Sequence, residues 1–175
     1  MSLNTAISKL DSEQIEFLIK NSIRKSSFLG YEFESLCFGS WKFLKETAPS
    51  LIKLGNFEKL ILEAFKDRKI NIFASDINNS NYNECLYFIF WIIDDLKHWT
   101  KTENEYLSAE PDVKLLAAGI NDLNQFGELN TIDSLANGDV TKYEEIKQLP
   151  YHVIFDKQFK SKIEGNINRK LAKQK

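Results

Sequence analysis

Apolar residues recur at helical spacing along most of the chain. A helix N-terminal signal at 11–14 precedes Ile15, Leu18, Ile19 and Ile23, which lie at helical spacing and predict a helix over about 12–28. The same periodicity predicts further helices over about 31–46, over 51–65 with an interruption at Gly55–Asn56, over 82–99, over 111–127, over 131–136, from Thr141 onward and from Pro150 onward. The chain therefore has an all-α pattern.

The helix over 82–99 is the most apolar of these elements. Residues 85–93 are apolar on every side, so this helix has to be covered on more than one face. Nine residues are too few to cross a bilayer, which takes about 20. We expect a central core helix and no membrane anchor.

Turn residues divide the chain. Pro49 is expected to end the second helix, and the Asn-rich stretch 76–81 is expected to be a loop where two subdomains meet. Residues 70–73 could form a short extended piece that pairs with nothing. The prediction is a domain of six to eight helices over 1–156, with no sheet of consequence, followed by a basic C-terminal helix or arm over 157–175.

Helix signals are dense between residues 111 and 150. Asn137–Gly138 is a stop signal, and Thr141 with Glu144 matches a capping box that would open the next helix. In the helix over 111–127, the positions expected to face inward are Val113, Leu115, Leu116, Ile120, Leu123 and Phe126.

Composition restricts the class of protein. With 7 Gly and 3 Pro in 175 residues, the chain is neither collagen-like nor rich in loops. Cys37 and Cys85 lie in apolar runs, which predicts buried reduced thiols and an intracellular compartment. The first residues lack the pattern of a signal peptide, so we expect no secretion by that route.

Charge is unevenly distributed although the net charge is only −2. Residues 102–145 hold ten acidic and two basic side chains, a net charge of −8, whereas 157–175 hold seven basic and one acidic, a net charge of +6. Such a layout suits nucleic acid, an acidic protein or a neighbouring copy of the chain. A sequence pI near 5.8 disfavours nucleic acid. The candidate partner-binding residues are Lys157, Lys160, Lys162, Arg169, Lys170, Lys173 and Lys175.

Candidate chemistry centres on two histidines. Asp95 and His98 share one helix face, so Asp94, Asp95, His98 and His152 could belong to a helical-bundle metalloenzyme. The simpler interpretation places the first three at the solvated end of a core helix. Cys37 lies in a predicted buried face, where a nucleophilic thiolate is not expected. Neither phosphate-binding glycine motif nor a C-x-x-C pair occurs, so we predict no catalytic residues, metal or cofactor.

One segment resembles a known class of proteins. The segment begins at Phe126-Gly127, continues through a short helix ending Leu135-Ala136-Asn137-Gly138-Asp139 and a capped helix with basic and acidic residues, and reaches Leu149-Pro150-Tyr151. It resembles small helical structural and tail-assembly proteins of tailed bacteriophages. The resemblance implies a non-enzymatic virion or assembly protein, located in the cytoplasm of the host cell or in the virion, that contacts copies of itself or neighbouring virion proteins. The metalloenzyme and a nucleic-acid-binding accessory protein remain the alternatives.

Overall fold

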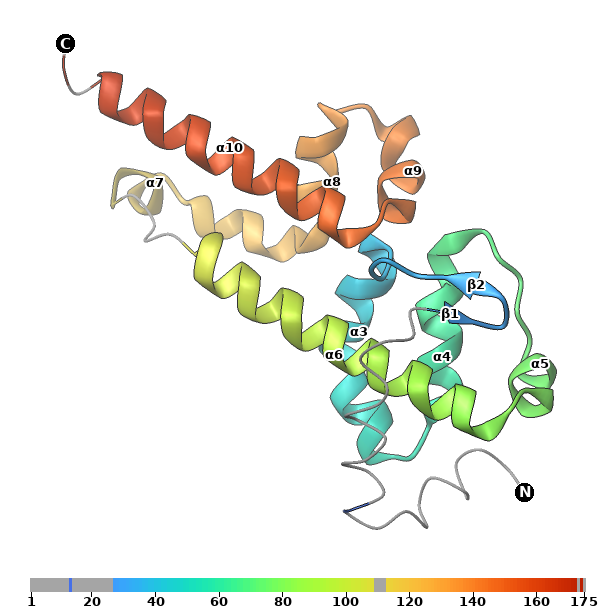
Figure 1. Ribbon diagram of the computed structural model, residues 1–175. Helices are drawn as coiled ribbons and strands as arrows, with labels where there is room; N and C mark the ends of the chain where they lie inside the picture. Colours follow the sequence, from blue (N-terminus) through green and yellow to red (C-terminus); the bar gives the residue numbers. More distant parts are fainter. Residues whose placement is uncertain (1–12, 14–26, 109–112, 173, 175) are drawn as a thin grey trace.

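Eight α-helices, three 3-10 helices and one short hairpin form the described part of the chain in the computed structural model, which describes residue 13, residues 27–108, residues 113–172 and residue 174 (Figure 1). The first half comprises β1 (Ser27–Phe28), β2 (Tyr31–Glu32), α3 (Phe38–Lys53), α4 (Phe57–Phe65), η1 (Lys66–Arg68), α5 (Ala74–Asn79) and α6 (Tyr82–Tyr106). The second half comprises α7 (Val113–Ala117), η2 (Ile120–Phe126), α8 (Glu128–Ala136), η3 (Val140–Lys142), α9 (Tyr143–Gln148) and α10 (Tyr151–Ala172). The predicted all-α fold is confirmed.

The hairpin β1–β2 was not predicted. Leu29 and Gly30 both have positive φ angles, of 51° and 79°, and they turn the chain so that Phe28 enters the core. The ring of Phe28 stacks on Phe88 with centroids 4.7 Å apart. The helix expected over 12–28 is therefore wrong at residues 27 and 28, and most of its length, residues 14–26, lies outside the described residues.

The second helix begins later and ends later than its pattern predicted. α3 starts at Phe38, because residues 31–32 belong to the hairpin, and it runs through Pro49 to Lys53. Pro49 is exposed, while Ala48 and Leu51 on the same turn are buried in the core and hold the helix together. The expectation that Pro49 ends this helix is wrong.

The predicted interruption at Gly55–Asn56 is confirmed. Gly55 has a φ of 67°, which favours glycine, and the side chain of Asn56 accepts a hydrogen bond from the backbone of Lys59 at the start of α4.

Residues 76–79 of the Asn-rich stretch belong to a helix, not to the loop that their composition suggested, and only residues 80–81 lie outside it. In α5, Asp76 Oδ2 accepts from the backbone N–H of Phe73 at 2.8 Å, and Asn78 Nδ2 donates to the Ala74 carbonyl at 2.8 Å. Local side-chain bonding thus completes one short helix. Residues 70–73 before it are irregular.

α6 is the central helix that the apolar run predicted. Its buried face packs on α3, α4 and β1, and it continues to Tyr106. Asn81 caps its start by accepting from the backbone of Asn83 at 2.9 Å. The side chains buried on α6 are Cys85, Leu86, Phe88, Ile89, Ile92, Asp95 and Leu96.

The last helix begins directly after Pro150, as predicted. Its first residue, Tyr151, donates its backbone N–H to Leu36 O at 2.8 Å, and the N–H of Phe38 donates to Leu149 O at 2.9 Å. The starts of α3 and α10 are thereby fastened to each other. From there α10 runs alongside α6 toward the same end of the molecule (Figure 1), without a break at residue 157.

The helix expected over 111–127 divides into two. α7 stops before Gly119, whose φ of 83° turns the chain into the 3-10 helix η2. The stop at Asn137–Gly138 is confirmed, because both residues have positive φ angles. The capping box is wrong: Asp139, and not Thr141, supplies the cap, and it accepts from the backbone of Thr141 at 3.1 Å.

Candidate interaction surface

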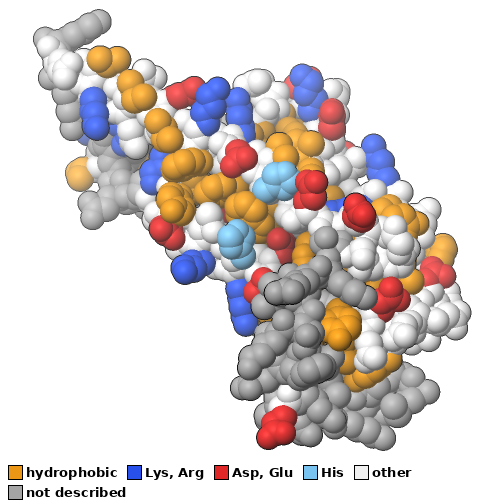
Figure 2. All heavy atoms as spheres, viewed as in Figure 1, with side chains coloured by type: hydrophobic (Ala, Val, Ile, Leu, Met, Phe, Trp, Pro, Cys, Tyr) orange, Lys and Arg blue, Asp and Glu red, His pale blue; other side chains and the backbone are white. Residues whose placement is uncertain are grey.

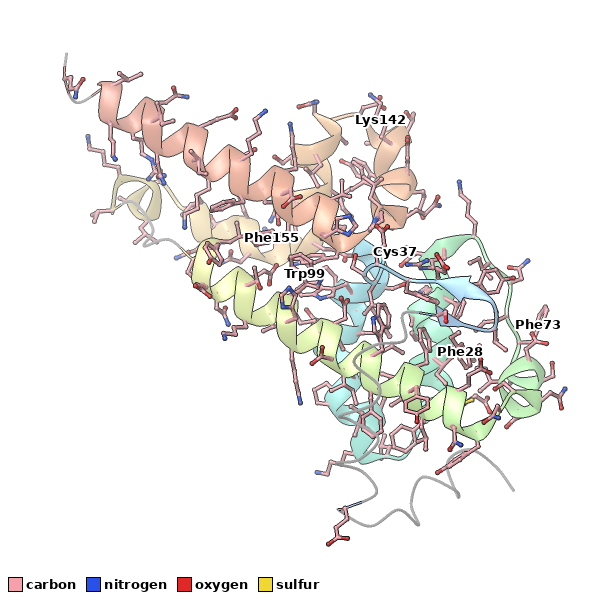
Figure 3. All side chains as sticks on the ribbon, viewed as in Figure 1. Phe28, Cys37, Phe73, Trp99, Lys142 and Phe155 are labelled. Carbon is pink, nitrogen blue, oxygen red and sulfur yellow. The ribbon has the colours of Figure 1, made fainter. Side chains whose placement is uncertain are left out.

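Aromatic side chains hold the first half of α10 against the body of the protein. Tyr151 is fully buried, and its ring stacks on Trp41 with centroids 3.9 Å apart. The ring centroid of Trp99 on α6 lies 5.3 Å from that of Phe155 (Figure 3) and 5.3 Å from that of Tyr151. These rings make the N-terminal residues of α10 part of the core, as expected for large aromatic side chains.

The packing of α10 on α6 reaches as far as Lys162. Tyr106 and Phe159 meet edge to face at 5.6 Å, and Lys162 Nζ donates to the carbonyls of Tyr106 and Ser108 at 2.7 and 2.8 Å. Both carbonyls lie at the C-terminal end of α6, where a cation is favourable. Beyond Lys162, the hydrogen bonds of the described side chains stay within α10, as when Arg169 donates to Asn166 at 3.0 Å.

An apolar stripe continues along α10 beyond Lys162. Its members, Ile163, Ile167 and Leu171, are 44%, 51% and 55% exposed and are spaced four residues apart. Figure 2 shows apolar side chains in a row where α10 extends away from the body. We call these three residues the distal stripe. An exposed apolar stripe on a helix that little else supports is typical of a surface that packs on a partner.

A second apolar surface lies on α7, η2 and the start of α8. Five of its residues, Val113, Leu116, Ile120, Leu123 and Phe126, were expected to face the interior, but they are exposed, which overturns that expectation. The side chain of Leu115, expected to face inward as well, lies outside the described part of the chain. We call this surface the η2 patch: Val113, Leu116, Ile120, Leu123, Phe126 and Leu129. Leu123 and Phe126 are half exposed, at 50% and 49%. η2 has seven residues, which is long for a 3-10 helix, because the hydrogen-bond geometry of such helices is poor. A partner chain that covers the η2 patch would therefore stabilise η2.

The two surfaces lie in segments of opposite charge. The η2 patch is part of the acidic segment 102–145, and the distal stripe is part of the basic segment 157–175. Lys157, Lys160, Arg169 and Lys170 are exposed on α10. Lys160 Nζ lies 3.8 Å from a carboxylate oxygen of Glu164 on the same helix, whereas Lys162 donates hydrogen bonds to backbone carbonyls at the end of α6. Lys160 is therefore freer than Lys162 to meet a partner. Lys173 and Lys175 lie outside the described residues.

The residues proposed for a metal site serve separate local contacts. Asp95 is buried and accepts from the Leu36 N–H and the Trp99 indole, each at 3.1 Å. Burial raises its pKa to about 6, although both hydrogen bonds act in the opposite direction. Asp94 and His98 are exposed, and His152 lies on α10 beside Ser35. Among the described residues, no three His, Cys, Asp or Glu side chains lie close enough together to hold a metal ion.

Ser35, His152 and Glu34 form a cluster that the sequence did not indicate. His152 Nδ1 lies 3.1 Å from Ser35 Oγ, and its Nε2 lies 3.7 Å from Glu34 Oε2. The order of residue types is that of a hydrolytic triad. However, Ser35 has no exposed surface, and its hydroxyl also accepts from the backbone N–H of His152 at 3.4 Å. The hydroxyl therefore links the start of α10 to the loop before α3.

Both cysteines are buried and free, as predicted. Burial raises the pKa of the Cys37 thiol, while the nearby Arg68 guanidinium acts against this. The Cys85 sulfur lies 2.9 Å from Ser80 Oγ, and burial raises its pKa as well. Arg68 itself donates to the carbonyls of Glu32 and Ser35 at 2.9 Å, so it ties the hairpin to the core.

Glu103 is a second carboxylate with several polar partners, and the sequence did not indicate it. It accepts from Lys45 of α3 and from the Tyr151 hydroxyl of α10, and Lys42 Nζ lies 3.6 Å away. Burial acts to raise its pKa, but these donors outweigh burial and lower it. Three helices thus meet at one carboxylate, which ties the start of α10 to α3 and α6.

No described helix combines the length and the apolar character needed to cross a bilayer. Comparison of the chain with family models, with curated proteins and with solved structures returns no match.

Proposed function

We propose that this protein is a non-enzymatic assembly component that binds other protein chains, above all further copies of itself. The observation that carries the proposal is the pair of exposed apolar surfaces, the distal stripe and the η2 patch, which lie in oppositely charged segments. The resemblance of residues 126–151 to bacteriophage structural and tail-assembly proteins adds the biological setting, a virion or its assembly in the host cytoplasm.

The contact that fits both surfaces is head-to-tail. The distal stripe of one copy, bordered by lysine and arginine, would pack on the η2 patch of the next copy, bordered by aspartate and glutamate. Apolar burial would supply most of the affinity, and the opposite charges would set the orientation. Because each copy offers two different faces, the contact would propagate into a ring or an open filament.

Solution mass as a function of concentration tests this function. The stripe variant carries Ile163→Gln, Ile167→Gln and Leu171→Gln, and the patch variant carries Leu123→Gln and Phe126→Gln. Glutamine keeps good helix propensity in α10 and removes the apolar surface. We expect the native chain to form oligomers larger than dimers and each variant to be a monomer when measured alone.

Mixing the two variants makes the test specific. Each variant keeps one intact face, so an equimolar mixture should form dimers and nothing larger. A matched control carries Leu54→Gln and Phe73→Gln, two exposed apolar residues outside both surfaces, and should assemble as the native chain does. A native chain that stays monomeric at high concentration, or a mixture that stays monomeric, would contradict the head-to-tail contact.

The same variants separate assembly from nucleic-acid binding. A variant with Lys157→Gln, Lys160→Gln, Arg169→Gln and Lys170→Gln loses the exposed cations of α10. If the native chain binds duplex DNA with strong salt dependence, remains a monomer and loses DNA binding in this variant, the accessory-protein alternative replaces our proposal.

A further inference from the structure

A groove lined by described residues lies between α3 and α6, outside the two assembly surfaces. Its volume is about 590 Å³, within the range of small-molecule sites. One wall comes from α3 and the other from the second half of α6. Its apolar lining consists of Leu44, Ala48, Pro49, Ile52, Ile93 and Leu96.

Three lysines lie along this groove, and none of the described residues that line it carries a carboxylate. Lys45, Lys97 and Lys101 contribute to its walls, together with Thr100 and Asn104. Lys45 is occupied, because it pairs with Glu103 and its Nζ lies 4.7 Å from the centroid of the Trp41 ring. Lys97 and Lys101 are exposed and lie one helical turn apart on α6, so their two ammonium groups can meet one anion.

The shape restricts the ligand further. The lining residues of α6 run from Ile93 to Asn104. At the helical rise this wall is about 16 Å long, and about 12 Å of it, room for an extended aliphatic chain of about ten carbon atoms, lies between Lys101 and Ile93. Lys97 lies near the middle of the α6 wall and Lys101 lies toward its Asn104 end, whereas Ile52 and Ile93 make the opposite end wholly apolar. A ligand that fits has an apolar tail and one compact anionic head.

We propose that the α3–α6 groove binds a free single-chain anionic amphiphile of the fatty-acid class, with its carboxylate at Lys97 and Lys101 and its aliphatic chain along Leu44, Ala48 and Ile93. Charge complementarity favours an anionic head over a neutral or cationic one. This site shares no residue with the distal stripe or the η2 patch, so its failure and the failure of the proposed function are distinguishable.

Calorimetric titration of the full chain with laurate below its micelle concentration tests the site. We expect saturable binding of one laurate per chain. Dodecyltrimethylammonium, with the same tail and a cationic head, should bind at least about tenfold more weakly, because it meets two ammonium groups. Shortening the acid to decanoate should weaken binding by up to about 15-fold, or about fourfold for each methylene removed from the apolar wall.

Two variants locate the site. Thr100→Trp places a large ring in the groove from a half-exposed position and should abolish binding. Lys97→Gln with Lys101→Gln should weaken laurate binding about tenfold or more and should remove the preference over the cationic amphiphile. The matched control, Lys53→Gln with Lys59→Gln, removes two charges from exposed positions outside the groove and should bind laurate as the native chain does.

Several results would overturn the proposal. They are the absence of saturable binding to the native chain, binding that persists in a folded Thr100→Trp variant, and equal affinity for both head groups. Flotation with anionic phospholipid vesicles that depends on Lys97 and Lys101, in the absence of laurate binding, would assign the groove to a membrane surface instead. Circular dichroism and the thermal midpoint establish that each variant is folded.

Discussion

The indole nitrogen of Trp99 donates a hydrogen bond to Oδ1 of Asp95, one helical turn earlier on α6, at 3.1 Å. The other carboxylate oxygen accepts the backbone N–H of Leu36 at 3.1 Å, from the loop that leads into α3. A single buried carboxyl therefore joins the central helix to that loop and orients the ring that packs on α10. Its two acceptor oxygens are both occupied, which explains how a carboxylate is accommodated in this apolar surrounding.

Acidification should stabilise the protein through Asp95. Its pKa in the folded chain is raised from 3.8 to about 6, so the stabilising contribution is fully present below pH 3.8 and is lost as the pH rises through 6. Between pH 7 and pH 5 the free energy of unfolding should gain about 1 kcal/mol from this group. Urea unfolding of the native chain and of Asp95→Asn at both pH values measures the effect as the difference between the two proteins. A difference that does not change with pH would show that Asp95 does not titrate in this range.

Substitutions at Glu103 and Tyr151 should reveal one shared interaction. Tyr151→Phe keeps the stacked ring and removes one donor, at a cost of about 1 to 2 kcal/mol. Glu103→Gln also leaves Lys42 and Lys45 without their anion and should cost about 1 to 3 kcal/mol. Because Tyr151 donates to Glu103, the double variant should lose less than the sum. Denaturant unfolding in a double-mutant cycle gives the coupling, and strict additivity would contradict the contact.

Gly39→Ala should destabilise the protein. A Cβ atom at this position would lie 2.5 Å from Asp67 Oδ2 and 3.2 Å from Lys147 Cβ, so η1 or α9 would have to move away from α3. We expect a loss of about 1 to 3 kcal/mol in the free energy of unfolding. Gly165→Ala is the matched control, because nothing lies near its Cβ position on α10, and it should gain up to about 1 kcal/mol from helix propensity. Equal effects of the two substitutions would argue against the close approach at Gly39.

Salt should weaken the assembly without abolishing it. Raising the salt concentration from about 0.05 M to about 0.5 M shortens the screening length several-fold and removes much of the attraction between the acidic and basic segments. The apolar burial of the distal stripe and the η2 patch is not screened. Sedimentation across this range should show a rising dissociation constant and persistent oligomers at high protein concentration. Complete dissociation at high salt would assign the contact to charge alone.

The elements that were correctly predicted are those with strong local signals. The apolar run at 85–93 fixed the central helix, and Asn137–Gly138 and Pro150 marked a helix end and a helix start. At these positions local conformation and tertiary packing favour the same structure. In the site, the basic residues of α10 were visible in the sequence.

The errors arose where packing outweighs local preference. Pro49 lacks an N–H group and usually ends a helix, yet burial of Ala48 and Leu51 carries α3 past it. Leu123 and Phe126 fit a buried helical face, but Gly119 turns the chain and leaves them exposed. The groove between α3 and α6 has no sequence signature, because it depends on how far apart two helices lie. Bonds such as that between Leu36 and Asp95 depend on tertiary folding in the same way.

The backbone pairing of residues 36–38 with 149–151 has a consequence for synthesis on the ribosome. The N–H of Phe38 and the carbonyl of Leu36 find their partners only after the chain has been extended by more than a hundred residues. Until Tyr151 has emerged, a nascent chain presents the bare indole of Trp41 at the start of α3. Truncated chains that end before Tyr151 would thus expose apolar surface that chaperones bind. Chains that include Tyr151 can form the contacts between residues 36–38 and 149–151 and fold.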